Sequence, residues 1–212
     1  MHFTKRYDDQ NSYSRMSDSR ISKLIPAKIR CISGCHDSQT SADVFNVSQF
    51  QLPDPAGKAG GACTSALLKV LRSQTFDGQV GLTWVEVLKK MRAELGGSYT
   101  QIPQLTSSQL MNMHEPFRIV PEGSDGRRRA VLIGINYCGQ QGELRGCHND
   151  ALNVKKYLLE SEGFLEDDVR CLFDDGIHMS PTRANIEGAL RNLAADSYSG
   201  DVIFLHYSGH GG

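Results

Sequence analysis

The sequence lacks the long hydrophobic runs that place a chain in or across a membrane. Its longest apolar runs, residues 130–135 and 202–205, fall far short of the roughly 20 residues that a spanning helix needs. The N-terminus has no apolar core of a secretory signal, and it mixes acidic residues with Arg and Ser, unlike an organelle transit peptide. These absences predict a soluble cytoplasmic protein with no membrane partner.

The chain also lacks a strong charge of either sign. Its 23 Lys and Arg residues nearly balance 24 Asp and Glu residues, so no basic field predicts a nucleic-acid partner. Without a secretory signal, cysteines are expected to remain reduced thiols. The six cysteines are Cys31, Cys35, Cys63, Cys138, Cys147 and Cys171.

The N-terminal half has few regular patterns. Residues 1–27 are polar and are expected to form a disordered arm, because they can bury little apolar surface. Thr83 and Glu86 form a capping box that starts a helix. The elements predicted in this half are a strand over 27–33, a long loop over 35–61, helices over 62–71 and 83–95, and at most an edge strand over 101–105, which contains a proline.

The pattern changes after a linker over residues 121–127. From residue 128 onward, short apolar runs alternate with segments of helical periodicity. The predicted order is a strand over 129–136, a helix over 148–162, a strand over 169–173, a helix over 180–193 and a strand over 201–206. This order predicts an α/β fold with a mostly parallel sheet flanked by helices.

Two polar segments follow strands of this predicted sheet. His210 comes directly after the third strand, with Ser208 before it and glycines after it. Asp150 follows the first strand, where it is either a helix-start carboxylate or a group that selects a cationic side chain. Because the carboxyl ends of parallel strands meet at one edge, both segments can line one cleft.

Several motifs together resemble those of metacaspases, which are caspase-fold cysteine peptidases. The segments that resemble their large-subunit region are RAVLIGINY at 129–137, LRGCHNDA at 144–151, PTRANI at 181–186 and YSGHG at 207–211. The segments that resemble their small-subunit region are ISGC at 32–35, DSQTSAD at 37–43 and PQLTSS at 103–108. The small-subunit region, 28–120, precedes the large-subunit region, 128–212, as in the type III metacaspases of algae.

The resemblance implies a chemistry and a substrate class. It makes His210 the general base of a Cys–His dyad. Cys147, Asp150 and Ser208 are implied to line the pocket for an Arg or Lys side chain before the cleaved bond. Partners are therefore expected to be protein or peptide substrates. The resemblance also implies calcium dependence of the complete enzyme, although no residue of this chain is expected to bind a metal or another cofactor.

The nucleophile is expected outside this sequence. In caspases the histidine lies about 50 residues upstream of the cysteine, which places the cysteine near about position 260. Cys147 matches a pocket position and Cys35 a small-subunit loop, and a thiol far from an imidazole keeps a pKa of about 8.5. We therefore expect an inactive, incomplete caspase-like chain that lacks the nucleophile-bearing strand. The alternative is a non-catalytic caspase-like module that regulates or dimerises with an active relative.

Two further interpretations rest on the cysteines. Metal binding is conceivable from the groups Cys31, Cys35 and His36 and Cys147 and His148, although these spacings contain no paired Cys-x-x-Cys set. A redox pair of Cys138 and Cys147 is conceivable because both follow the first strand of the alternating region. Reduced thiols without a metal are the favoured interpretation.

Overall fold

A computed structural model of the chain describes residues 5–6, 23–34, 43–44, 60–73, 81–96 and 101–210. The chain forms two compact units, each made of two stretches of sequence. The first unit contains Met1–Ser41 and Gln74–Phe117, and the second contains Ala42–Ser73 and Arg118–Gly212. The second unit thus includes Ala42–Ser73, which belongs to the small-subunit-like region 28–120 in the sequence.

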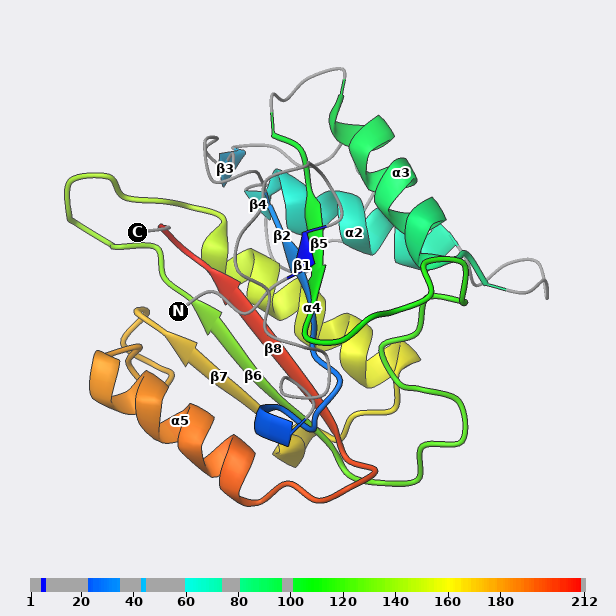
Figure 1. Cartoon of the computed structure of the whole chain (residues 1–212). Helices are drawn as coiled ribbons and strands as arrows, with labels where there is room; N and C mark the ends of the chain where they lie inside the picture. The colour runs from blue at the N-terminus through cyan, green and yellow to red at the C-terminus, as the bar shows by residue number, and fades with distance from the viewer. Residues whose placement is uncertain are drawn as a thin grey trace. The chain divides into compact units, whose positions relative to one another are not determined.

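The second unit is built around a three-stranded parallel sheet with the strand order β7-β6-β8 (Figure 1). This arrangement confirms an α/β fold with a small parallel sheet flanked by helices. The elements in chain order are β6 (Arg128–Gly134), α4 (Cys147–Ser161), the 3-10 turn η3 (Glu166–Asp168), β7 (Val169–Phe173), α5 (Arg183–Ala195) and β8 (Val202–Ser208).

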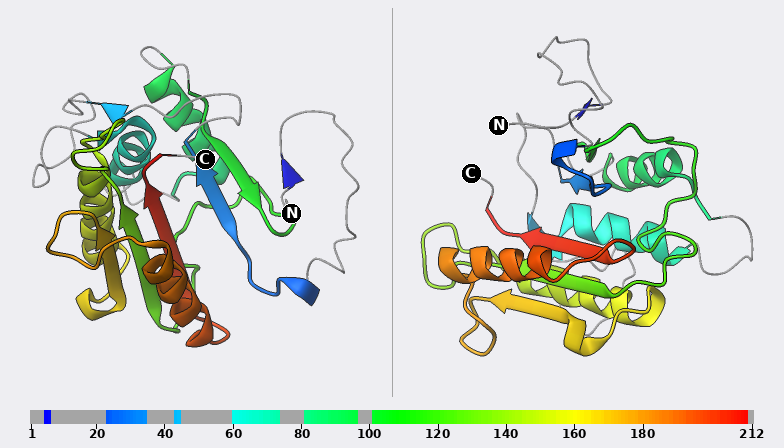
Figure 2. Two further views of the ribbon diagram at one scale, coloured as in Figure 1. Left: turned by 90° about the vertical axis from the view of Figure 1, so that its left-hand side faces the viewer. Right: turned by 60° about the horizontal axis from the view of Figure 1, so that its bottom comes forward.

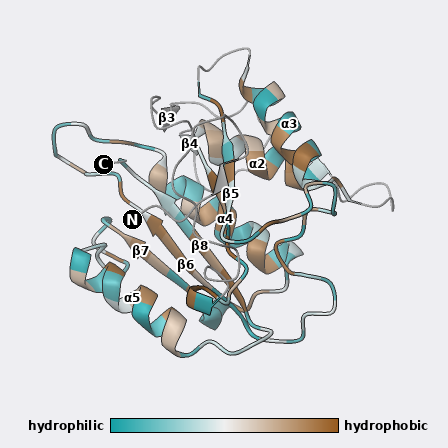
Figure 3. Cartoon of the chain, viewed as in Figure 1, coloured by the Kyte–Doolittle hydropathy of each residue, from teal (hydrophilic) through white to brown (hydrophobic). Residues whose placement is uncertain are grey.

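The helices α4 and α5 cover opposite faces of this sheet (Figure 2). Val131 and Ile133 of β6 pack with Leu172 of β7 and with α5. Leu132 lies between them in sequence, so its side chain points to the α4 face, where it is fully buried. The central strand β6 is predominantly hydrophobic, as expected for a strand covered on both faces (Figure 3). Burying one such side chain contributes about 1.5–3 kcal/mol.

The register of β6 and β8 brings the candidate residues to one edge of the sheet. Leu132 pairs with His206, and Gly134 pairs with Ser208 at the carboxyl ends of the two strands. The N–H of Ile135 donates to the carbonyl of Ser208 at 3.0 Å, which extends the pairing by one residue. The loop that follows β6 and the segment that follows β8 therefore leave the sheet side by side.

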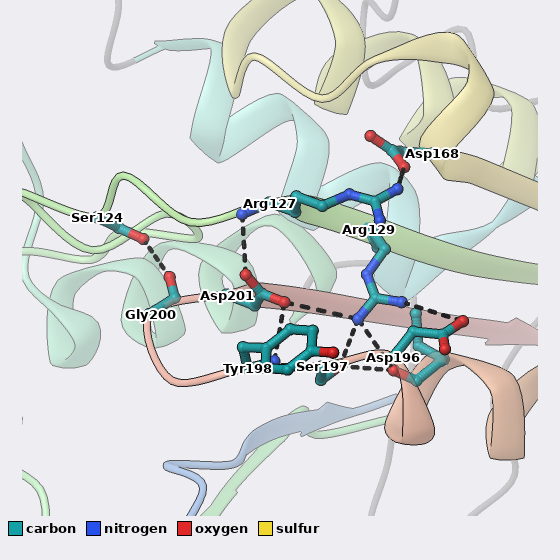
Figure 4. A network of polar contacts seen from close by, with 10 residues as sticks. Ser124, Arg127, Arg129, Asp168, Asp196, Ser197, Tyr198, Gly200 and Asp201 are labelled. Atoms are coloured by element: carbon teal, nitrogen blue, oxygen red, sulfur yellow. Dashed lines mark hydrogen bonds and ion pairs between the residues drawn. The ribbon is translucent and has the colours of Figure 1, made fainter.

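A polar network lies at the amino ends of β6 and β8, opposite to the end that carries the candidate residues (Figure 4). Asp201 precedes β8, and its carboxylate accepts from the backbone N–H groups of Arg127 and Tyr198, each at 3.0 Å. The buried guanidinium of Arg129 lies 3.6 Å from this carboxylate and donates to Ser197 Oγ at 2.6 Å. The network ties the start of β6 to the turn between α5 and β8, which fixes the register of these strands.

The remaining elements of the second unit come from the N-terminal half of the chain. They are β3 (Asp43–Val44), β4 (Gly60–Gly61) and α2 (Ala62–Arg72). β3 and β4 pair antiparallel, and both β4 and α2 pack against α4. The helix predicted over 62–71 is confirmed by α2.

The first unit contains an antiparallel sheet with the strand order β1-β5-β2. Its elements are β1 (Lys5–Arg6), β2 (Arg30–Ser33), α3 (Trp84–Leu95) and β5 (Gln104–Ser107). The predicted capping box is confirmed, because Thr83 and Glu86 bond reciprocally at the start of α3. The prediction of at most an edge strand near 101–105 was wrong. β5 lies in the middle of the sheet and begins after Pro103, so the proline does not interrupt its ladder.

Other boundaries differ by a few residues. α5 begins at Arg183 rather than at Ser180, because Thr182 acts as its N-cap and accepts from the N–H of Asn185 at 3.3 Å. Most of the predicted arm over 1–27 and of the predicted loop over 35–61 lies outside the described residues. No helix in the described part of the chain is both long and apolar enough to cross a membrane.

Candidate active site

His210 lies two residues beyond β8 with its imidazole exposed to solvent. Its Nε2 atom lies 2.6 Å from the carbonyl oxygen of Gly142, in the loop after β6. Because a carbonyl oxygen only accepts, Nε2 carries the hydrogen of the neutral ring, and Nδ1 is the atom with the basic lone pair. The ring therefore has one nitrogen fixed by the protein and one that can accept a proton.

Two tyrosines contact His210, one at its ring and one at its backbone carbonyl. The ring of Tyr137 packs against the imidazole with centroids 4.7 Å apart and an angle of 37° between the planes. The hydroxyl of Tyr207 donates to the backbone carbonyl of His210 at 2.9 Å. Burial and the hydrogen bond between its hydroxyl and that of Tyr137 raise the pKa of Tyr207, so this hydroxyl keeps its proton.

Asp150 occupies the first turn of α4 and is 2% exposed. The N–H of Gly61 donates to both of its carboxylate oxygens, at 2.8 and 3.0 Å. Ser208 Oγ donates to Oδ2 of Asp150 at 2.8 Å. The structure thus brings Asp150 and Ser208 together at the edge that carries His210.

Cys147 begins α4 and is buried. Its backbone N–H donates to Oδ1 of Asn136 at 3.0 Å, which joins the loop after β6 to the helix N-terminus. A side chain at Gly134 would meet the carbonyl oxygen of Cys147 at 2.6 Å, so glycine allows the strand and the helix to approach closely. The roles of Cys147, Asp150 and Ser208 in binding substrate stay predictions.

A histidine–carboxylate pair, His148 and Asp174, lies at the same end of the sheet. Asp174 follows β7, and its Oδ1 lies 2.6 Å from Nε2 of His148 in the first turn of α4. The same carboxylate accepts from the N–H groups of Asn136 at 2.8 Å and Tyr137 at 2.6 Å. Sequence reasoning missed Asp174, although an Asp pair directly after a predicted strand was a usable signal.

The cysteine clusters show no metal geometry in the part of the chain that the structure describes, where no three His, Cys, Asp or Glu side chains converge. Cys35 and His36 lie outside the described residues. Cys138 is exposed, Cys147 is buried, and neither is in a disulfide. A redox exchange between them stays untested.

Two family descriptions match the chain in consecutive regions. A caspase domain matches residues 4–114, and a metacaspase, peptidase C14 domain matches residues 128–212. The caspase match therefore precedes the metacaspase match along the sequence.

Individual relatives agree with this assignment. The chain is 50% identical over 191 residues to Metacaspase III c of Phaeodactylum tricornutum, which covers 89% of this chain and 57% of that protein. It is 51% identical over 89 residues to Metacaspase-1 of Sclerotinia sclerotiorum, which covers 41% of this chain and 21% of that protein. It is 37% identical over 141 residues to Metacaspase-1 of Saccharomyces cerevisiae, which covers 58% of this chain and 32% of that protein. The chain therefore spans between a fifth and somewhat over half of each of these relatives.

Proposed function

Because the chain belongs to the caspase and metacaspase family of cysteine peptidases, we propose that it supplies the general base and the basic-residue pocket of an endopeptidase that cleaves after Arg or Lys. The observation that carries this proposal is the placement of His210, Asp150 and Ser208 at one edge of the parallel sheet. The whole enzyme is longer than the chain in the relatives that it matches.

His210 acts as the base through Nδ1. The bond from Nε2 to the Gly142 carbonyl holds the ring in one tautomer. A cysteine thiol gives its proton to Nδ1, and the resulting thiolate attacks the peptide carbonyl carbon to form a tetrahedral intermediate. The C–N bond then breaks, the leaving amine takes the proton from Nδ1, and an acyl-enzyme thioester remains for hydrolysis.

Asp150 supplies the negative charge of the pocket. A guanidinium or ammonium that binds this carboxylate shares it with Gly61 N–H and Ser208 Oγ. Because Asp150 is 2% exposed, one of these donors must move when a cation arrives. The Ser208 hydroxyl can rotate away, whereas the Gly61 backbone N–H is fixed by β4.

We expect the nucleophile in residues that follow Gly212 in the complete enzyme. Burial raises the pKa of the Cys171 thiol. Slight desolvation and the carboxylates of Asp174 and Glu143 raise the pKa of the exposed Cys138 thiol. Thiols with raised pKa values contribute little thiolate at neutral pH. Cys147 matches a pocket position of the family and is buried, so we do not assign it the attack on the substrate.

Calcium dependence of the complete enzyme is part of the proposal. Among the described residues no cluster of three His, Cys, Asp or Glu side chains fits a metal ion, so no described residue is assigned to calcium. The reaction steps above use no bound ion. Comparing peptide cleavage in a calcium buffer and in a chelator tests this dependence in the complete enzyme.

The test of the base compares two proteins. One is the 212-residue chain, and the other, the extended protein, is this chain followed by the part of the Phaeodactylum tricornutum relative that comes after the matching region. We expect the extended protein to cleave peptides with Arg or Lys before a fluorophore, and the 212-residue chain not to cleave them. His210→Ala should lower kcat of the extended protein by about 10²–10⁴-fold, which is the usual contribution of general base catalysis.

The matched control is His178→Ala, because His178 also follows a strand at this edge and pairs with Asp175. It should keep the activity of the extended protein. Equal losses for the two histidine variants, or His210-dependent cleavage by the 212-residue chain alone, would contradict the proposal.

The test of the pocket is Asp150→Asn in the extended protein. Hydrogen bonds to a charged group contribute about 1.5–3 kcal/mol, so kcat/KM for Arg peptides should fall by roughly 10–150-fold. Peptides with a neutral side chain at this position should lose much less. A similar loss for both kinds of peptide would mean that Asp150 is structural only.

One observation favours the alternative of a non-catalytic module. Ile203, Leu205 and Tyr207 of β8 are each about half exposed and lie in a row on one face of the strand. Within the described residues β8 hydrogen-bonds only to β6. A module of this kind predicts that the 212-residue chain forms a dimer that Leu205→Lys dissociates, as measured by sedimentation. A chain that stays monomeric at high concentration would exclude it.

A further inference from the structure

Tyr137 has an unusual backbone conformation. Its φ of 55° is the one positive φ of a non-glycine residue within the described ranges. The left-handed region costs a residue with a Cβ atom about 1–2 kcal/mol. Such a conformation persists where the surroundings compensate for it, and it often marks a functional site.

The carbonyl of Tyr137 accepts from the N–H of Gln140 at 3.0 Å, and Asp174 holds the backbone that leads into Tyr137. Its two carboxylate oxygens accept separately from the N–H groups of Asn136 and Tyr137, so they bind the peptide on both sides of the Asn136 Cα atom. The carboxylate is itself held by His148, whose ring stacks on Phe173 with centroids 5.2 Å apart. The loop after β6 is thereby anchored to β7 and to α4.

The consequence appears at His210. The side chain of Tyr137, which leaves this left-handed backbone, packs its ring on the imidazole of His210. The Tyr137 hydroxyl also lies 3.4 Å from the hydroxyl of Tyr207, which binds the carbonyl of His210. A chain of contacts thus runs from Asp174 through Tyr137 to both the ring and the backbone of His210.

We propose that Asp174 is the positioning residue of His210: by accepting the backbone N–H groups of Asn136 and Tyr137 it fixes the backbone that leads into Tyr137, so that the Tyr137 ring lies against the imidazole. The inference rests on the proposed role of His210 as the base. Asp174 contacts neither the reacting atoms nor the imidazole, so it acts through Tyr137.

The charge state of Asp174 supports this role. Partial burial acts to raise its pKa, but the hydrogen bonds from Asn136, His148 and Tyr137 outweigh that effect and hold the pKa below the usual range for Asp. Both oxygens are therefore acceptors at neutral pH. An asparagine at this position offers one acceptor oxygen and one amide group, so it cannot accept from the two N–H groups through two separate oxygens as Asp174 does.

Asp175 provides a matched control. It is the next residue, it follows the same strand, and its carboxylate likewise accepts from two backbone N–H groups, those of Ile177 and His178. Its hydrogen bonds stay within its own turn and do not reach Tyr137. If Asp174 only stabilised its own loop, replacing Asp174 or Asp175 would affect His210 equally.

The experiment uses the 212-residue chain and the NMR signals of its histidine rings. Asp174→Asn should move the ring C–H signals of His210 toward those of Tyr137→Leu, which lacks the aromatic ring. Asp175→Asn should move the signals of His178 and leave those of His210 in place. Unchanged His210 signals in Asp174→Asn, while the His148 signals shift, would overturn the proposal, and so would equal shifts of His210 in the two Asp variants.

Two substitutions keep the test decisive if Asp174→Asn does not fold. Tyr137→Phe retains the aromatic ring and should largely preserve the His210 signals, whereas Tyr137→Leu should change them. Identical His210 signals in the unchanged chain, Tyr137→Phe and Tyr137→Leu would overturn the proposal, because the Tyr137 ring would then not contact the imidazole.

The extended protein links positioning to catalysis. Asp174→Asn should lower kcat with little change in KM, by about 10²-fold if the imidazole moves by about 1 Å. Asp175→Asn should leave kcat unchanged. An inactive extended protein would refute the proposed function, while the histidine signals of the 212-residue chain would still decide the role of Asp174.

Discussion

Replacing Gly61 with alanine is expected to destabilise the second unit through one specific collision. The backbone of Gly61 has φ −71° and ψ 131°, which alanine adopts without strain. Space is the obstacle, since a Cβ atom there would lie 2.5 Å from Oδ2 of Asp150. Asp150 cannot easily move away, because it is buried and Ser208 binds the same oxygen.

The magnitude follows from two contributions. Forcing a carbon atom into a packed site costs about 1–3 kcal/mol. Alanine is also a poorer N-cap than glycine for α2, which adds about 0.5–1 kcal/mol. We therefore expect Gly61→Ala to lower the free energy of unfolding by about 1.5–4 kcal/mol.

Gly188→Ala is the matched control, because a Cβ atom there meets nothing within 4 Å. Inside α5 it should stabilise by about 0.5–1 kcal/mol.

Urea unfolding followed by far-ultraviolet circular dichroism measures these changes, provided that the slopes remain alike. A double-mutant cycle isolates the collision. In an Asp150→Ala background the colliding oxygen is gone, so only the N-cap cost of about 0.5–1 kcal/mol should remain for Gly61→Ala. The same cost of Gly61→Ala in both backgrounds would refute the contact between β4 and Asp150.

Two further predictions concern the parallel sheet. Leu132→Ala should lower the free energy of unfolding by about 2–5 kcal/mol because its side chain is fully buried, whereas Leu165→Ala, at a position 67% exposed, should change it by less than about 0.5 kcal/mol in the same urea assay. His206 is partly exposed, but its Nε2 atom is enclosed without a hydrogen-bond partner among the described residues, and burial lowers its pKa to about 4. The unfolded chain therefore takes up a proton near pH 6.5 that the folded chain does not, so the stability from His206 is complete above about pH 6.5 and is lost between about pH 6.5 and 4. A histidine NMR titration in which His206 protonates near pH 6.5 in the folded chain would contradict this.

Regular patterns in the sequence were sufficient to predict the α/β unit. The apolar run around Leu132 and the alternation that follows it are local signals, and β6, α4, β7, α5 and β8 appear in the predicted order. The capping box at Thr83 is also local, because its two partners are three residues apart. Such signals depend on neighbours along the chain, so tertiary packing does not override them here.

The site depends on contacts that the sequence does not encode locally. Gly61 and Asp150 are 89 residues apart, and nothing in the pattern around either residue points to the other. The left-handed backbone of Tyr137 has no sequence signal, because tyrosine rarely adopts it. The hydrogen bonds that hold the backbone on its two sides come from Asp174, which follows β7, and from Gln140. The middle position of β5 was likewise hidden, since strand order is set by pairing across the whole first unit.

The most direct test of the central claim is to identify which cysteine reacts when the extended protein meets an arginyl chloromethyl ketone. Mass spectrometry of the labelled peptides locates the modified thiol. The account predicts one modified cysteine in the segment that follows Gly212, with labelling lost in His210→Ala and weakened in Asp150→Asn. Labelling of Cys147 or another cysteine within the 212 residues, dependent on His210, would contradict the account.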